Sequence, residues 1–283
     1  MFWIAGICNS LAFGAILFLL ASGFSLIFGL MRVANLTHGA FFMLGGYVAT
    51  STIAGGFGIS VLAAALACGA LGVAVEQIIV RRLQGRELAQ VLATLGLSFV
   101  IADQCLLLWS GDPISLAAPS TLQGAIRVGH FAFPAYRLFT IGIAFAIAVL
   151  LWLLVERTTL GAKIRAAVDD RMMAQATGIP VSRLFALVFG LGSALAGLGG
   201  ALAAPIMSVY PGLDTEMLPL ALLVVILGGI GSLVGALLGS VLIGLIYTFG
   251  QILAPDLAYV ILFLPMVFVL AVRPQGILGR LTT

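Results

Sequence analysis

Residues 156–180 read ERTTLGAKIRAAVDDRMMAQATGIP and form the only long polar run in an otherwise apolar chain. The run holds seven charged side chains, about a third of those in the whole sequence. Apolar segments long enough to cross a bilayer flank it on both sides. The stretch therefore predicts a polar loop between two membrane spans, and the rest of the chain is best interpreted from it.

The composition excludes a water-soluble fold. Of 283 residues, 62% are hydrophobic and only 8% are charged, and the mean hydropathy is +1.24, whereas soluble domains carry roughly 25% charged residues. The 35 glycines fit close helix packing in a membrane. We expect an all-α polytopic membrane helix bundle that forms a single domain over residues 1–283, with the lipid bilayer around it.

The apolar segments predict eight or nine transmembrane segments. A span needs about 20 apolar residues, and the candidates are 4–30, 33–53, 59–80, 88–109, 133–155, 181–206, 217–254 and 257–272. The seventh is interrupted by GGIGS, residues 228–232. A broken or re-entrant helix there divides it into two shorter segments and favours nine.

Basic residues predict the orientation. They gather in the 81–86 turn, the 156–183 region and the C-terminal tail, with Arg32 on the same side, whereas the 111–130 segment and the acidic link at 209–216 lie opposite. Cytoplasmic loops carry the excess of Lys and Arg. We therefore expect the N-terminus outside and the C-terminus in the cytoplasm, which requires an odd number of crossings.

Several chemistries lack a signature. The only lysine, Lys163, follows Ala162, so the G-x-x-x-x-G-K-[ST] phosphate loop that binds ATP is missing. His38 and His130 lack metal-ligand spacing, so we expect no metal site. No hydrolase or metalloprotease motif occurs, which argues against an enzyme. The net charge of +3 comes from loop arginines and reports topology, not nucleic-acid binding.

Polar groups inside apolar segments are candidates for function, because they are costly there. Glu76 lies five residues before Arg81, where pairing favours a structural carboxylate over an ion-coupling site. Asp103 and Gln104 lie in the outer half of the fourth span and predict either the lining of a transport path or a helix-packing contact.

The motif NLTHG, with Asn35, Thr37 and His38, opens the second apolar segment. Asn and Thr are good N-cap residues, so one interpretation is a capped helix at the inner membrane interface. The other is a gate or substrate contact that uses the free amides of the helix start. Both can hold together.

The polar run predicts two short helices. Thr158 or Thr159 can cap the first. Asp169 and Asp170 stand where negative charge favours the start of a second, which would run over 171–177 and end before Gly178 and Pro180. Its outward residues would be Met172, Met173, Ala176 and Ile179. Adjacent methionines offer an adaptable apolar contact, so we prefer a docking helix to a merely solvated loop.

At this loop the sequence resembles the permease subunits of bacterial ATP-binding-cassette (ABC) importers. Four motifs narrow the resemblance to permeases of branched-chain amino acid importers, and to the shorter of the two permeases. They are ASGFSLIFGLMRVANLTHGAFFMLGGYV (21–48), ERTTLGAKIRA (156–166), GGIGSLVGALLG (228–239) and RPQGILG (273–279). Ala166, Ala167, Ala174, Gly178, Ile179 and Pro180 match the docking-loop pattern, without its full glutamate-alanine-alanine opening.

The resemblance implies a bacterial inner-membrane complex. It would contain a second related permease, two cytoplasmic ATPases that bind ATP and Mg²⁺, and an extracytoplasmic solute-binding protein. The docking residues would be Asp170, Arg171, Met172, Met173, Thr177 and Gly178. We expect the substrate path to involve Asn35, Thr37, His38, Asp103, Gln104, Gly228, Gly229, Gly231 and Ser232.

The expected function is the import of branched-chain or other small hydrophobic amino acids, energised by separate ATPases. Relatives in this family also move urea, short amides and aromatic acids, so the same class of importer for those solutes stays open. A rival from another class is an ion-coupled secondary transporter that uses Glu76 or Asp103.

Overall fold

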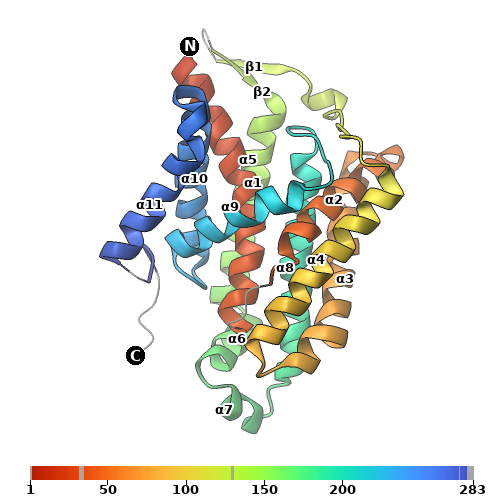
Figure 1. The fold of residues 1–283 in the computed structure, drawn as a ribbon, viewed down its shortest axis with the longest axis vertical. Coiled ribbons are helices and arrows are strands. Elements are labelled where there is room, and N and C mark those ends of the chain that lie inside the picture. The colour runs from red at the N-terminus through yellow and green to blue at the C-terminus, as the bar shows by residue number, and fades with distance from the viewer. Residues whose placement is uncertain (1, 32–34, 129–130, 274, 279–283) are drawn as a thin grey trace.

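The computed structural model describes residues 2–31, 35–128, 131–273 and 275–278, and it is an all-α bundle (Figure 1). Six helices are long and apolar enough to cross a membrane. They are α1 (Phe2–Met31), α3 (Phe57–Val75), α4 (Glu87–Trp109), α5 (Ala135–Arg157), α8 (Val181–Ala203) and α10 (Leu233–Leu253). A π-helical turn, Glu76–Val80, and a 3-10 turn, Arg81–Leu83, extend α3.

Three further apolar helices are short. They are α2 (His38–Thr52), α9 (Leu213–Gly228) and α11 (Ala258–Val272). With the six long helices they make nine apolar helices in the described ranges, of which six have the length of the nine transmembrane segments that the sequence favours. A helix of 15 or 16 residues rises only about 23 Å, however, less than the ~30 Å hydrocarbon core. Each of these three helices is therefore shorter than the hydrocarbon core.

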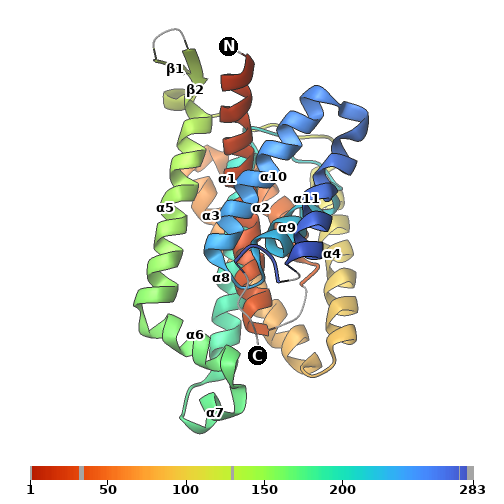
Figure 2. The ribbon, with the colours of Figure 1, turned by 90° about the vertical axis from the view of Figure 1, so that its left-hand side faces the viewer.

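The remaining elements lie at the two ends of the bundle. The polar helices α6 (Thr159–Asp169) and α7 (Arg171–Ala176) form one end, and the N-terminus lies at the other (Figures 1 and 2). At the N-terminal end, β1 (Ala125–Val128) and β2 (Phe131–Pro134) form an antiparallel hairpin in which Ala125 pairs with Pro134. Short 3-10 turns occupy Ile53–Gly55, Ser120–Leu122 and Pro255–Leu257.

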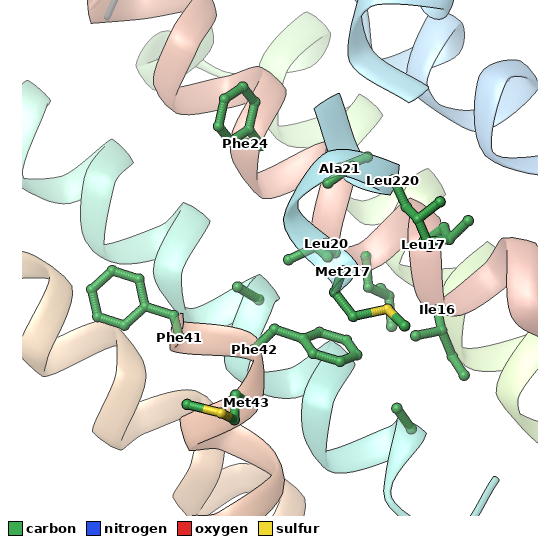
Figure 3. Packing of buried hydrophobic residues seen from close by; sticks show 14 of the residues in the cluster. Ile16, Leu17, Leu20, Ala21, Phe24, Phe41, Phe42, Met43, Met217 and Leu220 are labelled. Atoms are coloured by element: carbon green, nitrogen blue, oxygen red, sulfur yellow. The ribbon is translucent and has the colours of Figure 1, made fainter. Parts of the chain in front are cut away.

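Helices α1 and α8 form the buried centre, whereas α3, α4 and α5 are exposed over most of their surface. Figure 2 shows α1 running from the N-terminal end towards α6 between the outer helices. The largest apolar cluster joins α1 to the two short helices α2 and α9 (Figure 3). Its side chains include Ile16, Leu20, Phe42, Met217 and Leu220.

Glycines let these central helices touch backbone to backbone. A Cβ at Gly45 of α2 would collide with the backbone of Gly197 in α8, and one at Gly200 would collide with the carbonyl of Phe42. Small residues allow such close approach in membrane bundles. The α2–α8 contact therefore holds the short helix α2 inside the bundle.

The break at 228–232 is present as predicted. Helix α9 ends at Gly228, and Gly229 and Gly231 take positive φ angles of 102° and 77°, which glycine adopts without strain. Ser232 then caps α10 by accepting a hydrogen bond from the amide of Gly235 at 3.0 Å. Figure 1 shows that the chain turns sharply here, from α9, which lies across the bundle, into α10, which runs along it.

The C-terminal tail completes the end of α9. The amide of Ile277 donates to the carbonyl of Leu227 at 2.9 Å, and the amide of Leu278 donates to the carbonyl of Gly228 at 3.1 Å. The last carbonyls of a helix have no partner within the helix. The tail therefore supplies the hydrogen bonds that the broken helix lacks.

The segments that the sequence groups by charge lie together. Arg171 of α7 donates to Gln84 Oε1 at 2.6 Å, and Arg81 donates to the carbonyl of Ser182 at 3.0 Å, so the 81–86 turn and the polar loop share one end. At the other end, Ile114 and Val209 exchange backbone hydrogen bonds of 2.8 Å. Arg32 and Arg280 lie outside the described residues.

Candidate functional site

The motif NLTHG lies deep in the bundle. Asn35, Thr37 and His38 are all buried, and the ring Nε2 of His38 donates to the carbonyl of Leu20 at 2.9 Å. Leu20 is near the middle of the 30-residue helix α1. The predicted position at the inner interface is therefore wrong, because helix α2 begins inside the bundle and not at its edge.

The predicted side-chain cap at Thr37 is absent. Thr37 stands at the N-cap of α2, but its hydroxyl makes no capping bond and donates instead to the carbonyl of Thr94 in α4 at 2.7 Å. Asn35 Oδ1 accepts a hydrogen bond from the amide of Thr37 at 3.2 Å. The motif joins α2 to α4 and α1, so its side chains serve tertiary contacts.

The structure adds a polar stripe on α4 that we did not predict. Gln90, Thr94 and Ser98 are spaced four residues apart, and all three are buried. Gln90 Nε2 donates to the carbonyl of Val80 at 3.0 Å, and Thr94 Oγ1 accepts from the amide of Leu36 at 3.3 Å. Spacing of four residues puts side chains on one helix face, and this was the available sequence signal.

Asp214 is a further residue that sequence reasoning missed as a site residue. The sequence places it in the acidic link between two apolar segments, but it lies in the first turn of α9 and only 3% of its surface is exposed. Ser98 Oγ donates to Asp214 Oδ2 at 3.4 Å. Ser98 is the midpoint of α4, about 16 Å from either end at 1.5 Å per residue. The carboxylate thus lies at mid-depth.

Three polar atoms of this region have no hydrogen-bond partner among the described residues. They are Asn35 Nδ2, His38 Nδ1 and Asp214 Oδ1. Because Nε2 of His38 donates to a carbonyl, Nδ1 of a neutral ring is an acceptor. The junction of α2, α4 and α9, which we call the mid-membrane junction (Asn35, Thr37, His38, Thr94, Ser98 and Asp214), therefore holds one unused donor and two unused acceptors.

Asp103 and Gln104 do not belong to this junction. Both are exposed on the outer face of α4. Asp103 borders a shallow hollow of about 510 Å³ that Phe99, Leu106 and Pro211 also line. Among the described residues, therefore, neither side chain is buried in a contact with another helix.

The glycine turn is also separate from the junction. A Cβ at Gly29 of α1 would contact Gly231, so the turn lies against that part of α1. Nine residues of α1 separate Gly29 from Leu20, which is about 13 Å along the helix axis. Gly228, Gly229, Gly231 and Ser232 thus lie at a different depth from His38.

The polar loop folds as the sequence predicts. Thr158 caps α6 by accepting from the amide of Gly161 at 3.3 Å, and Asp170 caps α7 by accepting from the amide of Met173 at 2.9 Å. Helix α7 ends at Ala176, and Gly178 has a φ of +83°. Met172 and Met173 are 81% and 61% exposed.

One residue of this loop differs from the prediction. Ile179 is partly buried and packs against the apolar cluster that joins the loop to α8, so it does not face outward. The guanidinium of Arg171 lies 5.0 Å from the centre of the Phe185 ring, a cation–π contact. Helix α7 is therefore fixed on its inner side and free on its methionine side.

Glu76 is fully buried, and Arg81 Nη2 lies 3.1 Å from its Oε2. This ion pair agrees with the structural interpretation of Glu76. In the described ranges no three residues of the types His, Cys, Asp and Glu gather as metal ligands.

Comparison with known proteins yields a family match. Residues 6–270 match the model of the family described as branched-chain amino acid transport system / permease component. The permease protein BraD of a high-affinity branched-chain amino acid transport system in Pseudomonas aeruginosa is 28% identical, over 96% of this chain and 94% of that protein. The corresponding protein LivH of Escherichia coli is 26% identical, over 99% and 96%.

A relative with a different cargo also matches. The ribose import permease protein RbsC of Escherichia coli is 28% identical, over 90% of this chain and 80% of that protein. Identities to permeases for an amino acid and for a sugar are thus similar.

Proposed function

Because the chain belongs to the family of branched-chain amino acid transport system permease components, we propose that it forms the membrane path of an ABC importer for branched-chain or similar small apolar amino acids. The match over residues 6–270 is the observation that carries this proposal. The relatives BraD and LivH are permease components and not enzymes. The chain is a multi-pass membrane protein with six apolar helices of spanning length in its described part.

The proposed complex has further subunits. Two ATPases would bind ATP and Mg²⁺ and hydrolyse the nucleotide, because this sequence has no phosphate loop. A second permease and an extracytoplasmic binding protein would complete the importer. Positive charge at the α6–α7 end supports a cytoplasmic position for that end and an external position for the N-terminus.

The docking surface for the ATPase is assigned to α7. Met172 and Met173 project from its free side, and such side chains adapt to an apolar groove. Asp170 starts the helix, Thr177 and Gly178 end it, and Arg171 holds it against Gln84. A force on the methionines would therefore reach α8 and the 81–86 turn through fixed contacts.

The path is assigned to the mid-membrane junction and to the glycine turn at 228–232. Broken helices expose backbone groups that can bind a substrate in many carriers, and this supports a role for the glycine turn at another depth of the path than the junction. Asp103 and Gln104 would join this path only through a second permease that covers their face of α4. A carboxylate exposed to lipid costs up to about 3 kcal/mol, and this supports a protein neighbour there.

Reconstitution tests the function. We expect the two permeases, the ATPases and the binding protein to take up radiolabelled leucine into liposomes only with ATP. Uptake by this chain alone, driven by a proton or sodium gradient, would instead establish the secondary transporter. If the complex takes up urea, a short amide or an aromatic acid with ATP but does not take up leucine, the protein is still an ABC importer permease, but the proposed substrate is wrong.

Variants of α7 test the docking surface. We expect Met173→Glu to abolish co-purification of the ATPase and transport, because it puts a charge in the apolar contact. Gly178→Pro should do the same, since a φ of +83° is closed to proline. Met173→Leu keeps the apolar surface and is the control. Normal ATPase binding by the Met173→Glu variant would show that α7 is not the docking surface for the ATPase.

A further inference from the structure

We propose that Asp214 is the group in the path that receives the ammonium group of the transported amino acid. The inference rests on the proposed function and deepens it, because it names the chemical feature of the substrate that the permease itself recognises. Nothing in the sequence patterns or the family match assigns a role to this residue.

The burial of Asp214 without a cation is the first observation. Its side chain contacts the midpoint of α4 through Ser98, and Oδ1 has no hydrogen-bond partner within the described ranges. A charged group at the centre of a membrane protein is costly and marks a functional site by default. A group that supplied only stability would be expected to have its hydrogen bonds satisfied.

Glu76 is the contrasting case within the same molecule. It is as deeply buried as Asp214, but Arg81 Nη2 lies 3.1 Å from its Oε2. Asp214 has no such ion pair with any described residue. The structure therefore provides a cation for one buried carboxylate and leaves the other to bind a cation from outside the chain.

The neighbouring unused groups match the other half of an amino acid. Asn35 Nδ2 is a donor without a partner among the described residues, and it belongs to the segment that binds Thr94. Thr94 and Ser98 are one turn apart on α4, about 6 Å along the axis. The unused donor and the unused acceptor therefore belong to segments that contact neighbouring turns of α4. An amino acid carries on one carbon both a carboxylate that accepts from such a donor and an ammonium that donates to such an acceptor.

The charges also select among substrates. A free carboxylate attracts an ammonium group and repels the carboxylate of an aromatic acid. Urea and short amides bring no cation to neutralise it. The junction is closed in this structure, since Asn35, His38 and Asp214 are each at most 3% exposed. The substrate therefore reaches Asp214 only when α2, α4 or α9 shifts during the transport cycle.

The test uses the complete importer in liposomes, with leucine as substrate. We expect Asp214→Asn to lower ATP-driven uptake at least tenfold, while ATPase stimulation by the loaded binding protein is retained. Glu216→Gln removes an exposed carboxylate from the same helical turn and should leave uptake unchanged. Equal uptake by Asp214→Asn and the wild type would overturn the inference.

A second variant covers the case in which Asp214→Asn does not assemble. Ser98→Cys preserves a small side chain beside the carboxylate and can be labelled with an ammonium-bearing thiol reagent during ATP turnover, with the modified peptide located by mass spectrometry. We expect labelling at position 98 that leucine suppresses. Labelling that leucine leaves unchanged, or no labelling during turnover, would contradict occupancy of this site by the substrate.

The experiments distinguish an error in the proposed substrate from an error in the role of Asp214. If the wild-type complex imports no leucine, the proposed substrate is wrong. If the wild type imports leucine and the Asp214 and Ser98 variants give the negative results above, only the role of Asp214 is wrong.

Discussion

The two faces of helix α4 differ in kind. The inner face carries Gln90, Thr94 and Ser98, and each makes a hydrogen bond to another part of the chain. The outer face carries Leu92, Phe99 and Asp103, which are exposed. One helix therefore has a polar side that faces protein and a mainly apolar side that does not. This is the reverse of the pattern in a water-soluble helix.

The difference shows how two carboxylates of one region can have opposite surroundings. Asp103 lies within the span but points out of the bundle, whereas Asp214 lies in a short helix and points into it. The position of a residue along a span therefore does not determine whether its side chain faces the outside or the interior of the bundle. The helix face on which the residue lies determines this.

The largest effect is expected at Ser98. Ser98→Leu removes a bond to Asp214 and puts a bulky side chain into a packed interface, so we expect a loss of more than about 3 kcal/mol in the free energy of unfolding in detergent. The neighbouring change Phe99→Leu on the outer face should cost less than about 1 kcal/mol, because little packs there. Similar losses for both variants would abolish the distinction between the two faces.

Thiol labelling compares adjacent positions directly. Cys105 is buried and only 1% exposed, whereas Gln104 is exposed. We expect a maleimide to label Gln104→Cys on the order of a hundredfold faster than the native Cys105, since the buried thiol reacts only after local opening. In the full importer, protection of position 104 would support a second permease on this face. Equal rates at 104 and 105 in the isolated chain would contradict the assigned orientation of α4.

A smaller effect is expected at Thr94. Thr94→Val keeps the volume but leaves the amide of Leu36 without its acceptor, so stability should fall by about 1–2 kcal/mol. Gly96→Ala is the matched control, because a Cβ at Gly96 meets no atom within 4 Å, and helix propensity then favours alanine by up to about 1 kcal/mol. Thermal unfolding in detergent measures both, and a stabilising Thr94→Val would contradict the role of this bond.

The smallest effect is expected at Asp103. In the isolated chain in detergent, Asp103→Asn should change stability by less than about 0.5 kcal/mol, because the side chain is exposed. The same thermal measurement checks this. A loss above 1 kcal/mol would mean that the outer face holds a contact inside this chain.

The sequence predicted the features that depend on local chemistry. The break at Gly228–Ser232, the cap at Asp170 and the end of α7 before Gly178 follow from glycine and from a capping carboxylate, and all three are present. These signals act over a few residues. Neighbouring helices do not alter them.

The features set by packing were not predictable in the same way. The start of α2 at His38 and the burial of Asp214 depend on contacts with α1, α4 and α8. A run of apolar residues does not tell a complete span from a short helix inside the bundle. The four-residue spacing of Gln90, Thr94 and Ser98 was visible, but only the fold shows which helices face it.

The hydrogen bonds from Ile277 and Leu278 to the end of α9 have a consequence for the order of biosynthesis. Synthesis runs from the N-terminus, so the carbonyls of Leu227 and Gly228 receive these partners only after residues 277 and 278 have been made. Until then the end of α9 is incomplete, although the residues of α9 and α10 have already been joined. A ribosome stalled before residue 276 would present the insertion machinery with an unfinished helix end.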